Sequence, residues 1–215
     1  HLPFSDLLVK IELFKNKLKF RQLTKSIFPD FYFQGVNLNE LKNIQFDQLP
    51  LPFIIKPTVG FMSMGVYKVT NHLEWVDTLA SITAEIEQIK NLYPDSVLNT
   101  SSFIIEQCIN GEEFAVDVYY NAVGEAVVLS ILKHVFASDA DVSDRVYVSS
   151  KEIIEKNLTE FTEFAERIGR LAAVKNFPVH IELRRDSDGT LLPIEVNPMR
   201  FGGWCTTADI SFLAY

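Results

Sequence analysis

Apolar residues recur at helical spacing in three stretches of the chain. The first runs from Phe4 to Thr24 with Lys and Glu interleaved, which is the pattern of an amphipathic helix. The second covers residues 73–91 and is predicted to follow an N-cap at Asn71, because Glu74 stands three residues later. One face of this helix is apolar and is made up of Val76, Leu79, Ile82, Ile86 and Ile89. We expect that face to pack against the core.

The third helical stretch is predicted to begin at Ser149, because Glu152 completes a capping-box spacing. Short apolar runs between and after the helices are bounded by turn residues and predict strands. A weak helical turn at 39–42 precedes the first strand, which ends at Pro57. The predicted strands are residues 49–57, 101–109, 112–120, 126–134, 178–185 and 191–197. Helices that cover one face of mainly antiparallel sheets make up the α+β class, which we predict for this chain.

Composition and charge restrict the class of function. The chain has 215 residues, of which 47% are hydrophobic and 22% are charged, as in a globular protein with a substantial core. Its net charge of -8 argues against nucleic acid as a partner. No apolar run approaches the ~18 residues of a membrane span, and two cysteines without CxxC spacing favour a cytoplasmic location. A homodimer is compatible with the sequence. Because the chain begins with His1, we expect it to be a fragment.

The last two predicted strands form a hairpin that brings polar residues together. An Asp-Gly pair at 188–189 is a favoured two-residue turn, and with this turn Glu182 faces Glu195 while His180 faces Asn197. Strand alternation places these four side chains on one face of the hairpin. The opposite face is predicted to be the core side and carries Val179, Ile181, Leu183, Ile194 and Val196.

The facing carboxylates of Glu182 and Glu195 require compensation. At about 5 Å apart they repel by about 3 kcal/mol at an effective dielectric constant near 20. Either one carboxyl group keeps a proton with a raised pKa, or a divalent cation lies between them and Asn197 adds an oxygen suited to magnesium. The alternative is a solvated acidic face that is neutralised by Arg184, Arg185 or Arg200. For His180 there are also two alternatives: it is an ordinary polar residue of a strand, or it is part of the site.

A short loop at 56–66 follows a strand that ends in Lys56. The loop contains Gly60, Ser63 and Gly65, and such loops let backbone N–H groups approach phosphate oxygens. It is neither a Walker A motif nor a GxGxxG motif. Taken alone, it is explained equally well as an ordinary hairpin loop with a surface lysine.

Three segments, in this order along the chain, resemble the ATP-grasp superfamily. They are the lysine-ended strand with its glycine loop at 56–66, an E-x-x-x-x-G-x-E-F segment at 106–114 and an H-x-E…E-x-N-P hairpin at 180–198. The resemblance extends from Lys17 to Gly203 and is to carboxylate–amine and carboxylate–thiol ligases, such as D-alanine:D-alanine ligases and carbamoyl-phosphate-synthase-like domains.

The resemblance implies an ATP-grasp fold, in which two α+β lobes with antiparallel sheets grip ATP between them. The N-terminal lobe with its preceding helix would be residues 1–106, and the C-terminal lobe with the metal-binding hairpin would be residues 107–215. The resemblance also implies an α/β domain that precedes the chain in such ligases.

The resemblance also implies ATP, Mg2+ and, as its substitute, Mn2+ as cofactors, with roles for individual residues. The residues implied to contact the ATP phosphates are Lys17, Lys56 and Ser63. Those implied to lie by the adenine are Glu106 and the backbone of Gln107 through Ile109, while Glu113 would hydrogen-bond the ribose hydroxyls. Those implied to hold two magnesium ions are Glu182, Glu195 and Asn197.

Three residues are predicted to act on the reacting groups. His180 takes the place of a cation that precedes the first metal carboxylate in the ligases. Arg200 corresponds to the arginine of their N-P-R ending, displaced by one position because this chain reads Asn197-Pro198-Met199-Arg200. Arg145 is suited to contact with a phosphate or carboxylate, and the alternative is a surface arginine.

The function implied is ATP-dependent ligation. A small-molecule carboxylate would be activated as an acyl phosphate and attacked by an amine or a thiol, and ADP and phosphate would be released. One alternative is a small-molecule kinase of the same fold. Another is a non-catalytic module that binds nucleotides.

Overall fold

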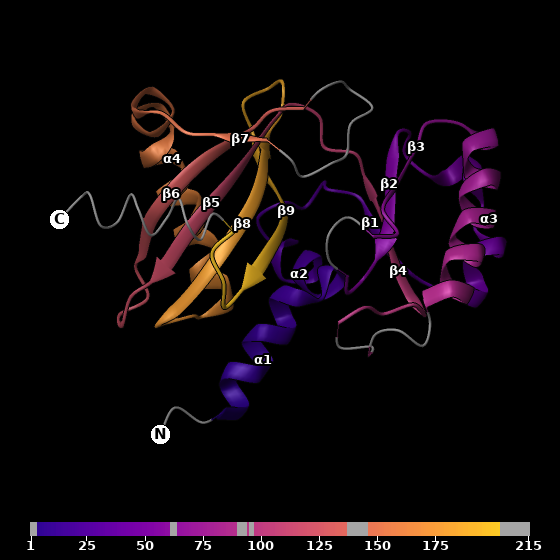
Figure 1. Cartoon of the computed structure of the whole chain (residues 1–215), viewed down its shortest axis with the longest axis horizontal. Coiled ribbons are helices and arrows are strands. Elements are labelled where there is room, and N and C mark those ends of the chain that lie inside the picture. Colours follow the sequence, from indigo (N-terminus) through magenta and orange to yellow (C-terminus); the bar gives the residue numbers. More distant parts are fainter. Residues whose placement is uncertain (1–3, 61–63, 90–93, 95–96, 137–145, 203–215) are drawn as a thin grey trace. The chain divides into compact units, whose positions relative to one another are not determined.

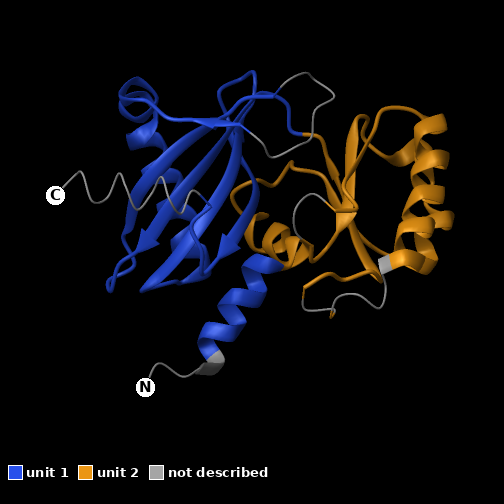
Figure 2. Ribbon diagram, viewed as in Figure 1, with its two compact units in different colours: residues 1–15, 109–215 blue, residues 16–108 orange. Residues whose placement is uncertain are grey.

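The computed structural model describes residues 4–60, 64–89, 94, 97–136 and 146–202 (Figure 1). Two compact units make up the chain: unit 1 comprises residues 1–15 and 109–215, and unit 2 comprises residues 16–108 (Figure 2). The predicted boundary after residue 106 lies two residues from the second of these boundaries. The first 15 residues, however, cluster with unit 1 and not with the segment that follows them.

The predicted single helix from Phe4 to Thr24 is two helices. Helix α1 (Phe4–Lys15) ends before Asn16, and helix α2 (Lys17–Thr24) begins after it. Asn16 has an extended backbone, and its side-chain oxygen accepts a hydrogen bond of 3.1 Å from the N–H of Lys19. A short amide side chain offers this alternative to the continuous helical ladder, so Asn16 caps a new helix. Apolar periodicity alone does not show such a break.

Unit 2 contains a four-stranded antiparallel sheet with strand order β1-β4-β2-β3. Its strands are β1 (Phe33–Asn37), β2 (Phe53–Pro57), β3 (Tyr67–Val69) and β4 (Ser102–Gln107). The other elements are α2, the 3-10 helices η1 (Leu38–Asn43) and η2 (Phe46–Gln48), and helix α3 (His72–Ile89). The strand ending at Pro57 and the helical turn near residue 40 are therefore confirmed.

Helix α3 packs on the unit 2 sheet, with Trp75 in its buried face instead of the predicted Val76. Trp75 is buried and its ring packs edge-on against Phe53, with 5.6 Å between the ring centroids. Ile82 and Ile86 are buried on the same side, whereas Val76 is 51% exposed and its predicted core position is wrong. The large indole at position 75 sets the buried face, because 75, 82 and 86 follow helical spacing.

Unit 1 contains a five-stranded antiparallel sheet with strand order β7-β6-β5-β8-β9. Its strands are β5 (Glu112–Tyr120), β6 (Ala126–His134), β7 (Tyr147–Val148), β8 (Phe177–Arg185) and β9 (Leu191–Pro198). Helix α4 (Lys151–Ala172) covers one face, where Phe114 and Phe161 pack edge to face. Gly169 allows this closeness, because a Cβ there would lie 2.2 Å from the Tyr120 ring. The N-terminal helix α1 belongs here because the buried ring of Phe14 packs against Phe177 of β8.

The two predicted helix caps have different outcomes. The cap of α3 is confirmed, because the N–H of Glu74 donates to the Asn71 side chain at 3.1 Å. The cap of α4 is one residue later than predicted: the hydroxyl of Ser150 accepts from the N–H of Ile153. The Ser149 hydroxyl donates instead to a carbonyl of β6. Either of the two adjacent serines could cap the helix. Ser150 does so, because the segment before it pairs with β6.

The β8–β9 hairpin reaches the predicted pairing by a different route. The turn is a three-residue loop, because the N–H of Asp186 donates to the carbonyl of Thr190 and Gly189 has a φ of +82°. The predicted two-residue turn is therefore wrong. A β-bulge then follows between Glu182 and Leu183.

The bulge restores the predicted pairs. Glu182 faces Glu195 and His180 faces Asn197, as the sequence predicted. Ile194 is the extra residue of the bulge, so it is partly exposed and its predicted core position is wrong.

None of the described helices is long and apolar enough to cross a membrane.

Candidate functional site

Polar side chains form a grid on the face of the unit 1 sheet that does not carry Phe114. Each row of the grid runs across neighbouring strands, because antiparallel pairing places the partners side by side. The first row is Ser130, Asp117, His180 and Asn197 on β6, β5, β8 and β9. The second contains Glu182 and Glu195, and the third contains His134, Glu113 and Arg184.

The carboxylates of Glu182 and Glu195 share one amide. The Asn197 Nδ2 donates to Oε1 of Glu182 at 3.1 Å and to Oε1 of Glu195 at 2.9 Å. His180 Nε2 lies 3.7 Å from the same oxygen of Glu182. The side chains of Glu182, Glu195 and Asn197 are all partly exposed. The structure thus brings the predicted metal ligands together on one accessible face.

Neutralisation of this pair by arginine finds no support at two of the three candidate positions. Arg184 binds Glu113, and Arg185 binds Glu160 and Asn157 on helix α4. Arg200 is exposed just beyond β9.

The donor set fits a hard divalent cation. Two carboxylates and one amide oxygen are ligands that Mg2+ accepts, with water or phosphate in its other positions. A half-turn of the Asn197 amide exchanges its Nδ2 for its oxygen, so the group that joins the carboxylates can also serve as a ligand. No group of three or more His, Cys, Asp or Glu side chains arranged to hold a metal occurs in the described ranges. The third protein ligand in this set is therefore an amide.

Asp117 is a polar residue of this face that the sequence analysis did not single out. It is fully buried, and its Oδ1 lies 2.7 Å from His180 Nδ1 and 2.9 Å from the N–H of Gly202. Gly202 approaches the imidazole so closely that a Cβ there would lie 2.1 Å from the ring. The one sequence signal for Asp117 is a carboxylate inside the apolar run at 114–120, which requires a buried partner.

Glu113 lies in a second buried cluster of the same face. Its Oε1 contacts His134 Nδ1 at 2.9 Å, and its Oε2 accepts from Arg184 Nε at 2.8 Å and from Nη2 at 2.7 Å. Arg184 Nη1 also donates to the carbonyl of Ile109 at 2.7 Å. The predicted ribose ligand is therefore already held by two protein groups.

Unit 2 gathers cations around a single buried carboxylate. Glu106 Oε2 contacts Arg21 Nε at 2.7 Å, and Oε1 contacts Lys56 Nζ at 2.6 Å. Burial raises the pKa of Glu106, but the charges of Arg21 and Lys56 and their hydrogen bonds outweigh this and hold it at about 2. Arg21 was not predicted as a site residue; its signal is the spacing of one helical turn from Lys17.

Lys17 lies where the glycine loop begins. Its backbone N–H donates to the carbonyl of Thr58 at 2.8 Å, and its Nζ lies 3.5 Å from the carbonyl of Gly60. The side chain is buried. Unit 2 therefore brings Lys17 to the loop that also follows Lys56, as the prediction requires.

The predicted adenine segment is partly occupied by its own fold. The N–H of Gln107 donates to the carbonyl of Tyr32, and the N–H of Cys108 donates to that of Pro52, both at 3.1 Å. Two of the three backbone N–H groups from Gln107 through Ile109 are thus used within unit 2. The unit boundary falls directly after Cys108.

Two predicted site residues, Ser63 and Arg145, lie outside the described residues. The residue that displaces Arg200 from Pro198 is Met199, and it has a φ of +59°. A left-handed backbone is unusual for a side chain of this size. Its N–H donates to the carbonyl of Pro178, which ties the segment to β8. The altered N-P-R spacing therefore coincides with a specific backbone turn.

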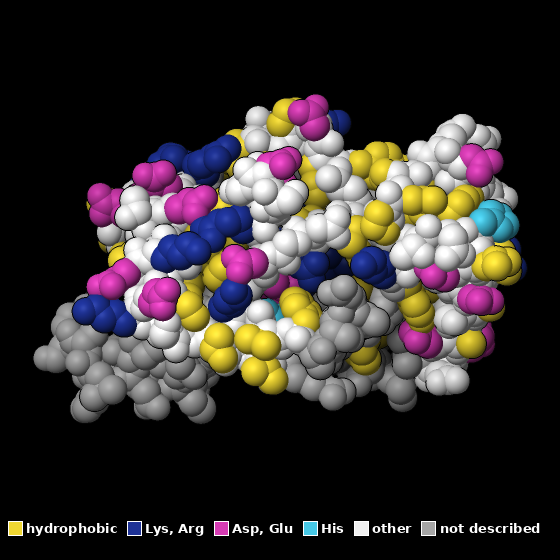
Figure 3. Space-filling model, turned by 90° about the horizontal axis from the view of Figure 1, so that it is seen from above, with side chains coloured by type: hydrophobic (Ala, Val, Ile, Leu, Met, Phe, Trp, Pro, Cys, Tyr) yellow, Lys and Arg dark blue, Asp and Glu magenta, His cyan; other side chains and the backbone are white. Residues whose placement is uncertain are grey.

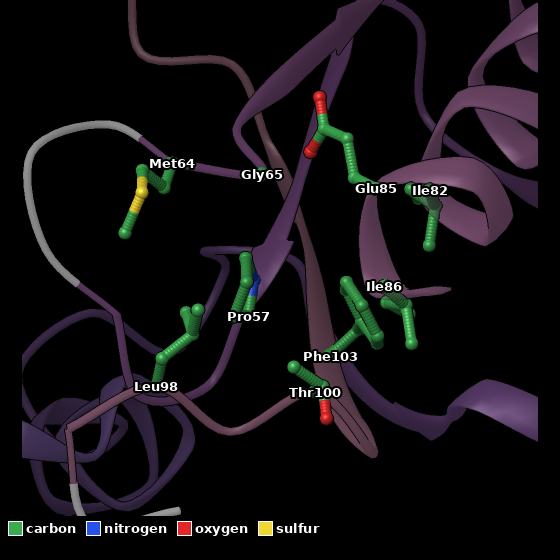
Figure 4. A pocket seen from close by; sticks show the side chains of 9 residues that line it. All are labelled: Pro57, Met64, Gly65, Ile82, Glu85, Ile86, Leu98, Thr100 and Phe103. Atoms are coloured by element: carbon green, nitrogen blue, oxygen red, sulfur yellow. The ribbon is translucent and has the colours of Figure 1, made fainter. Parts of the chain in front are cut away.

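A small pocket lies elsewhere in unit 2, between β2, β4 and α3 (Figure 4). Its lining includes Pro57, Gly65, Ile86 and Phe103. The pocket is mostly apolar and contains none of the predicted site residues. On the face shown in Figure 3, basic side chains lie among acidic ones. Neither feature adds a polar centre to the clusters described above.

Known proteins resemble this chain over most of its length. The model of the ATP-grasp domain matches residues 49–208. An L-arginine-specific L-amino acid ligase of Bacillus subtilis is 26% identical over 160 residues, which are 73% of this chain and 36% of that protein.

Solved structures agree with this match. The L-amino acid ligase of Bacillus licheniformis has a TM-score of 0.67 and 25% identity, and the match covers 96% of this chain and 44% of that one. Biotin carboxylase of Campylobacter jejuni has a TM-score of 0.69 at 15% identity, with 93% and 44% covered. The predicted fold is thereby confirmed. The chain spans less than half the length of each of these proteins.

Proposed function

Because the chain belongs to the ATP-grasp domain family, we propose that the protein is an ATP-dependent ligase that joins a carboxylate to an amine. The observation that carries the proposal is the hairpin set of facing Glu182 and Glu195 with Asn197 between them. A pair of like charges that face each other is costly unless a cation joins it. Among ATP-dependent reactions, transfer of a phosphoryl group has this requirement.

The cations of unit 2 suit the phosphates of ATP. Within the described ranges, Lys56 uses one of its three N–H donors on Glu106, which leaves two for phosphate oxygens. Arg21 takes the other oxygen of Glu106, which holds that carboxylate in one orientation. Lys17 lies beside the first carbonyls of the glycine loop. We assign Lys17 and Lys56 to the phosphates and Arg21 to the support of Lys56.

Magnesium would be held by Glu182, Glu195 and Asn197, and when bound it offsets charge on the phosphoryl group under transfer. His180 is kept in one orientation by Asp117 and Gly202 and presents its Nε2 toward Glu182. We assign His180 and Arg200 to the phosphoryl group or the acyl phosphate. Arg145 is assigned to the substrate carboxylate.

The proposed reaction has two steps. In the first, a carboxylate oxygen attacks the γ-phosphorus, the bond to the β,γ-bridging oxygen breaks and ADP leaves. In the second, the amine nitrogen attacks the carbonyl carbon of the acyl phosphate, phosphate leaves and the nitrogen loses a proton. One relative is named as a ligase of L-amino acids. We therefore propose that both substrates are amino acids and that the product is a dipeptide.

The test is magnesium-dependent ADP release by the protein with a panel of amino acids, with the products identified by mass spectrometry. Glu195→Gln is expected to lower turnover by at least about 100-fold, in the range of a lost electrostatic contribution to phosphoryl transfer. Asp188→Asn, in the exposed turn of the same hairpin, is the matched control and should leave turnover unchanged. Unchanged turnover in Glu195→Gln would refute the metal assignment. A stable phosphate ester as product would replace the ligase with a kinase.

A further inference from the structure

Arg184 uses all three nitrogens of its guanidinium group on two parts of the E-x-x-x-x-G-x-E-F segment at 106–114. Nε and Nη2 donate to Oε2 of Glu113, and Nη1 donates to the carbonyl of Ile109. The guanidinium also lies over the ring of Phe136, 5.4 Å from its centroid. Because the guanidinium is planar and rigid, its contacts fix Glu113 and Ile109 relative to each other.

Gly111 tightens the same segment. A Cβ at Gly111 would lie 2.0 Å from the carbonyl oxygen of Arg185, and its φ is +107°. The backbone therefore passes against β8 at a distance that only glycine permits. The contacts of Arg184 and the close approach of Gly111 hold residues 109–113 against β8, in addition to the pairing of β5 with β8.

In the part of the chain that the structure describes, the carboxylate of Glu113 has one acceptor position left. Its two oxygens offer about four lone-pair positions in total. Arg184 takes two positions on Oε2, and His134 takes one on Oε1. His134 is held between the rings of Phe136 and Tyr147, at centroid distances of 3.9 Å and 4.5 Å. A single position on Oε1 therefore remains for a donor from outside the chain.

We propose that Arg184 is a positioning residue for the nucleotide, which aims Glu113 so that it accepts from one ribose hydroxyl and not from both. The proposal rests on the proposed function, because it takes ATP as the ligand, and it keeps Glu113 in the ribose role that the resemblance implies. It adds a prediction about selectivity: the two ribose hydroxyls contribute unequally to affinity. It also assigns a role in nucleotide binding to an arginine that does not touch the nucleotide.

The test compares ATP with 2′-deoxyATP and 3′-deoxyATP by calorimetry and by steady-state kinetics. In the unsubstituted protein, one deoxynucleotide should bind about 10-fold more weakly than ATP, the range of one hydrogen bond to a charged group. The other should bind within about 3-fold of ATP. Arg184→Met should weaken ATP binding by about 10-fold and remove the difference between the two deoxynucleotides. KM for ATP should rise while kcat changes little.

Arg185→Met is the matched control, because it removes an adjacent arginine that binds Glu160 and Asn157 of α4. It should leave ATP affinity within about 3-fold of the unsubstituted protein, as no hydrogen bond to Glu113 is lost. Arg184→Lys keeps the charge but cannot bridge Glu113 and Ile109, and it should lose affinity to an intermediate extent. It also serves as the test variant if Arg184→Met does not fold.

Three results would overturn the inference. They are equal affinity for the two deoxynucleotides in the unsubstituted protein, unchanged ATP affinity in the Arg184 variants, and equal losses in the Arg184 and Arg185 variants. If the unsubstituted protein bound no ATP, the proposed function would fail and this inference with it. ATP binding that does not depend on Arg184 would remove the inference alone.

Discussion

Two carboxylate clusters, one in each unit, are arranged in opposite ways. In unit 2, the one carboxylate of Glu106 has two cationic partners and is almost fully buried. In unit 1, the two carboxylates of Glu182 and Glu195 share one neutral amide and remain partly exposed. The first cluster is completed by the protein itself, and the second is completed by a ligand under the proposed function. The first should therefore contribute to stability and the second to binding.

The largest expected effect is on the unit 2 cluster. Glu106→Gln leaves Arg21 and Lys56 buried without their carboxylate, and breaking a buried ion pair in this way costs about 3–5 kcal/mol. Urea unfolding of unit 2 measures the loss. Glu112→Gln is the control, because its pair with Lys133 is exposed and should contribute less than about 1 kcal/mol. Similar losses in the two variants would show that the buried cluster of Glu106 contributes no more to stability than an exposed ion pair.

Acid should act on the same cluster. The pKa of Glu106 falls from an ordinary 4.5 to about 2 in the folded protein. A depressed carboxyl pKa stabilises the fold fully above pH 4.5 and loses that contribution as the pH falls toward 2. The contribution is about 3 kcal/mol. The free energy of unfolding of the unsubstituted protein should thus approach that of Glu106→Gln between these pH values, and a constant gap would contradict the assignment.

Asp117 is a buried carboxylate of unit 1, which allows the comparison within a single sheet. Asp117→Ala removes the acceptor of His180 and of the Gly202 N–H, with an expected loss of about 2 kcal/mol. Asp117→Asn keeps an oxygen in place and should recover part of this loss. Asp188→Ala in the exposed turn should change the free energy of unfolding by less than about 0.5 kcal/mol. Equal effects at 117 and 188 would show that burial of Asp117 carries no energy.

The smallest effect on stability has the opposite sign. Glu195→Gln removes the repulsion between facing carboxylates and should stabilise the metal-free protein by up to about 1 kcal/mol. Magnesium should stabilise the unsubstituted protein and leave the variant unchanged, because ligand binding favours the folded state. Thermal unfolding with and without magnesium measures both. A metal-free variant that is less stable would show that Glu195 stabilises the fold itself, as Glu106 is expected to do.

Local pattern determined much of what was predicted correctly. Strands β5 and β6 were predicted at their observed limits, because turn residues bound each apolar run. The pairing of Glu182 with Glu195 was also predicted, although the assumed turn was wrong and the bulge at Ile194 compensated for it. A short hairpin leaves few registers that keep one face apolar, which made the pairing robust.

The residues that were missed pair across long separations in the sequence. Arg21 and Glu106 are 85 residues apart, Arg184 and Glu113 are 71 apart, and His180 and Asp117 are 63 apart. Periodicity shows which face a residue occupies but not which distant residue lies opposite. The partners of Glu106, Glu113 and His180 therefore required the assembled sheets.

Unit 2 is one continuous stretch of chain, whereas unit 1 is completed by helix α1 from the other side of it. This arrangement sets an order of events during synthesis on the ribosome, where the N-terminal part emerges first. All of residues 16–108 emerge before Phe177, so unit 2 has its whole sequence while the ring of Phe14 still lacks this partner. We therefore expect helix α1 to stay undocked through most of translation, and a chaperone that recognises exposed apolar segments would encounter it during that interval.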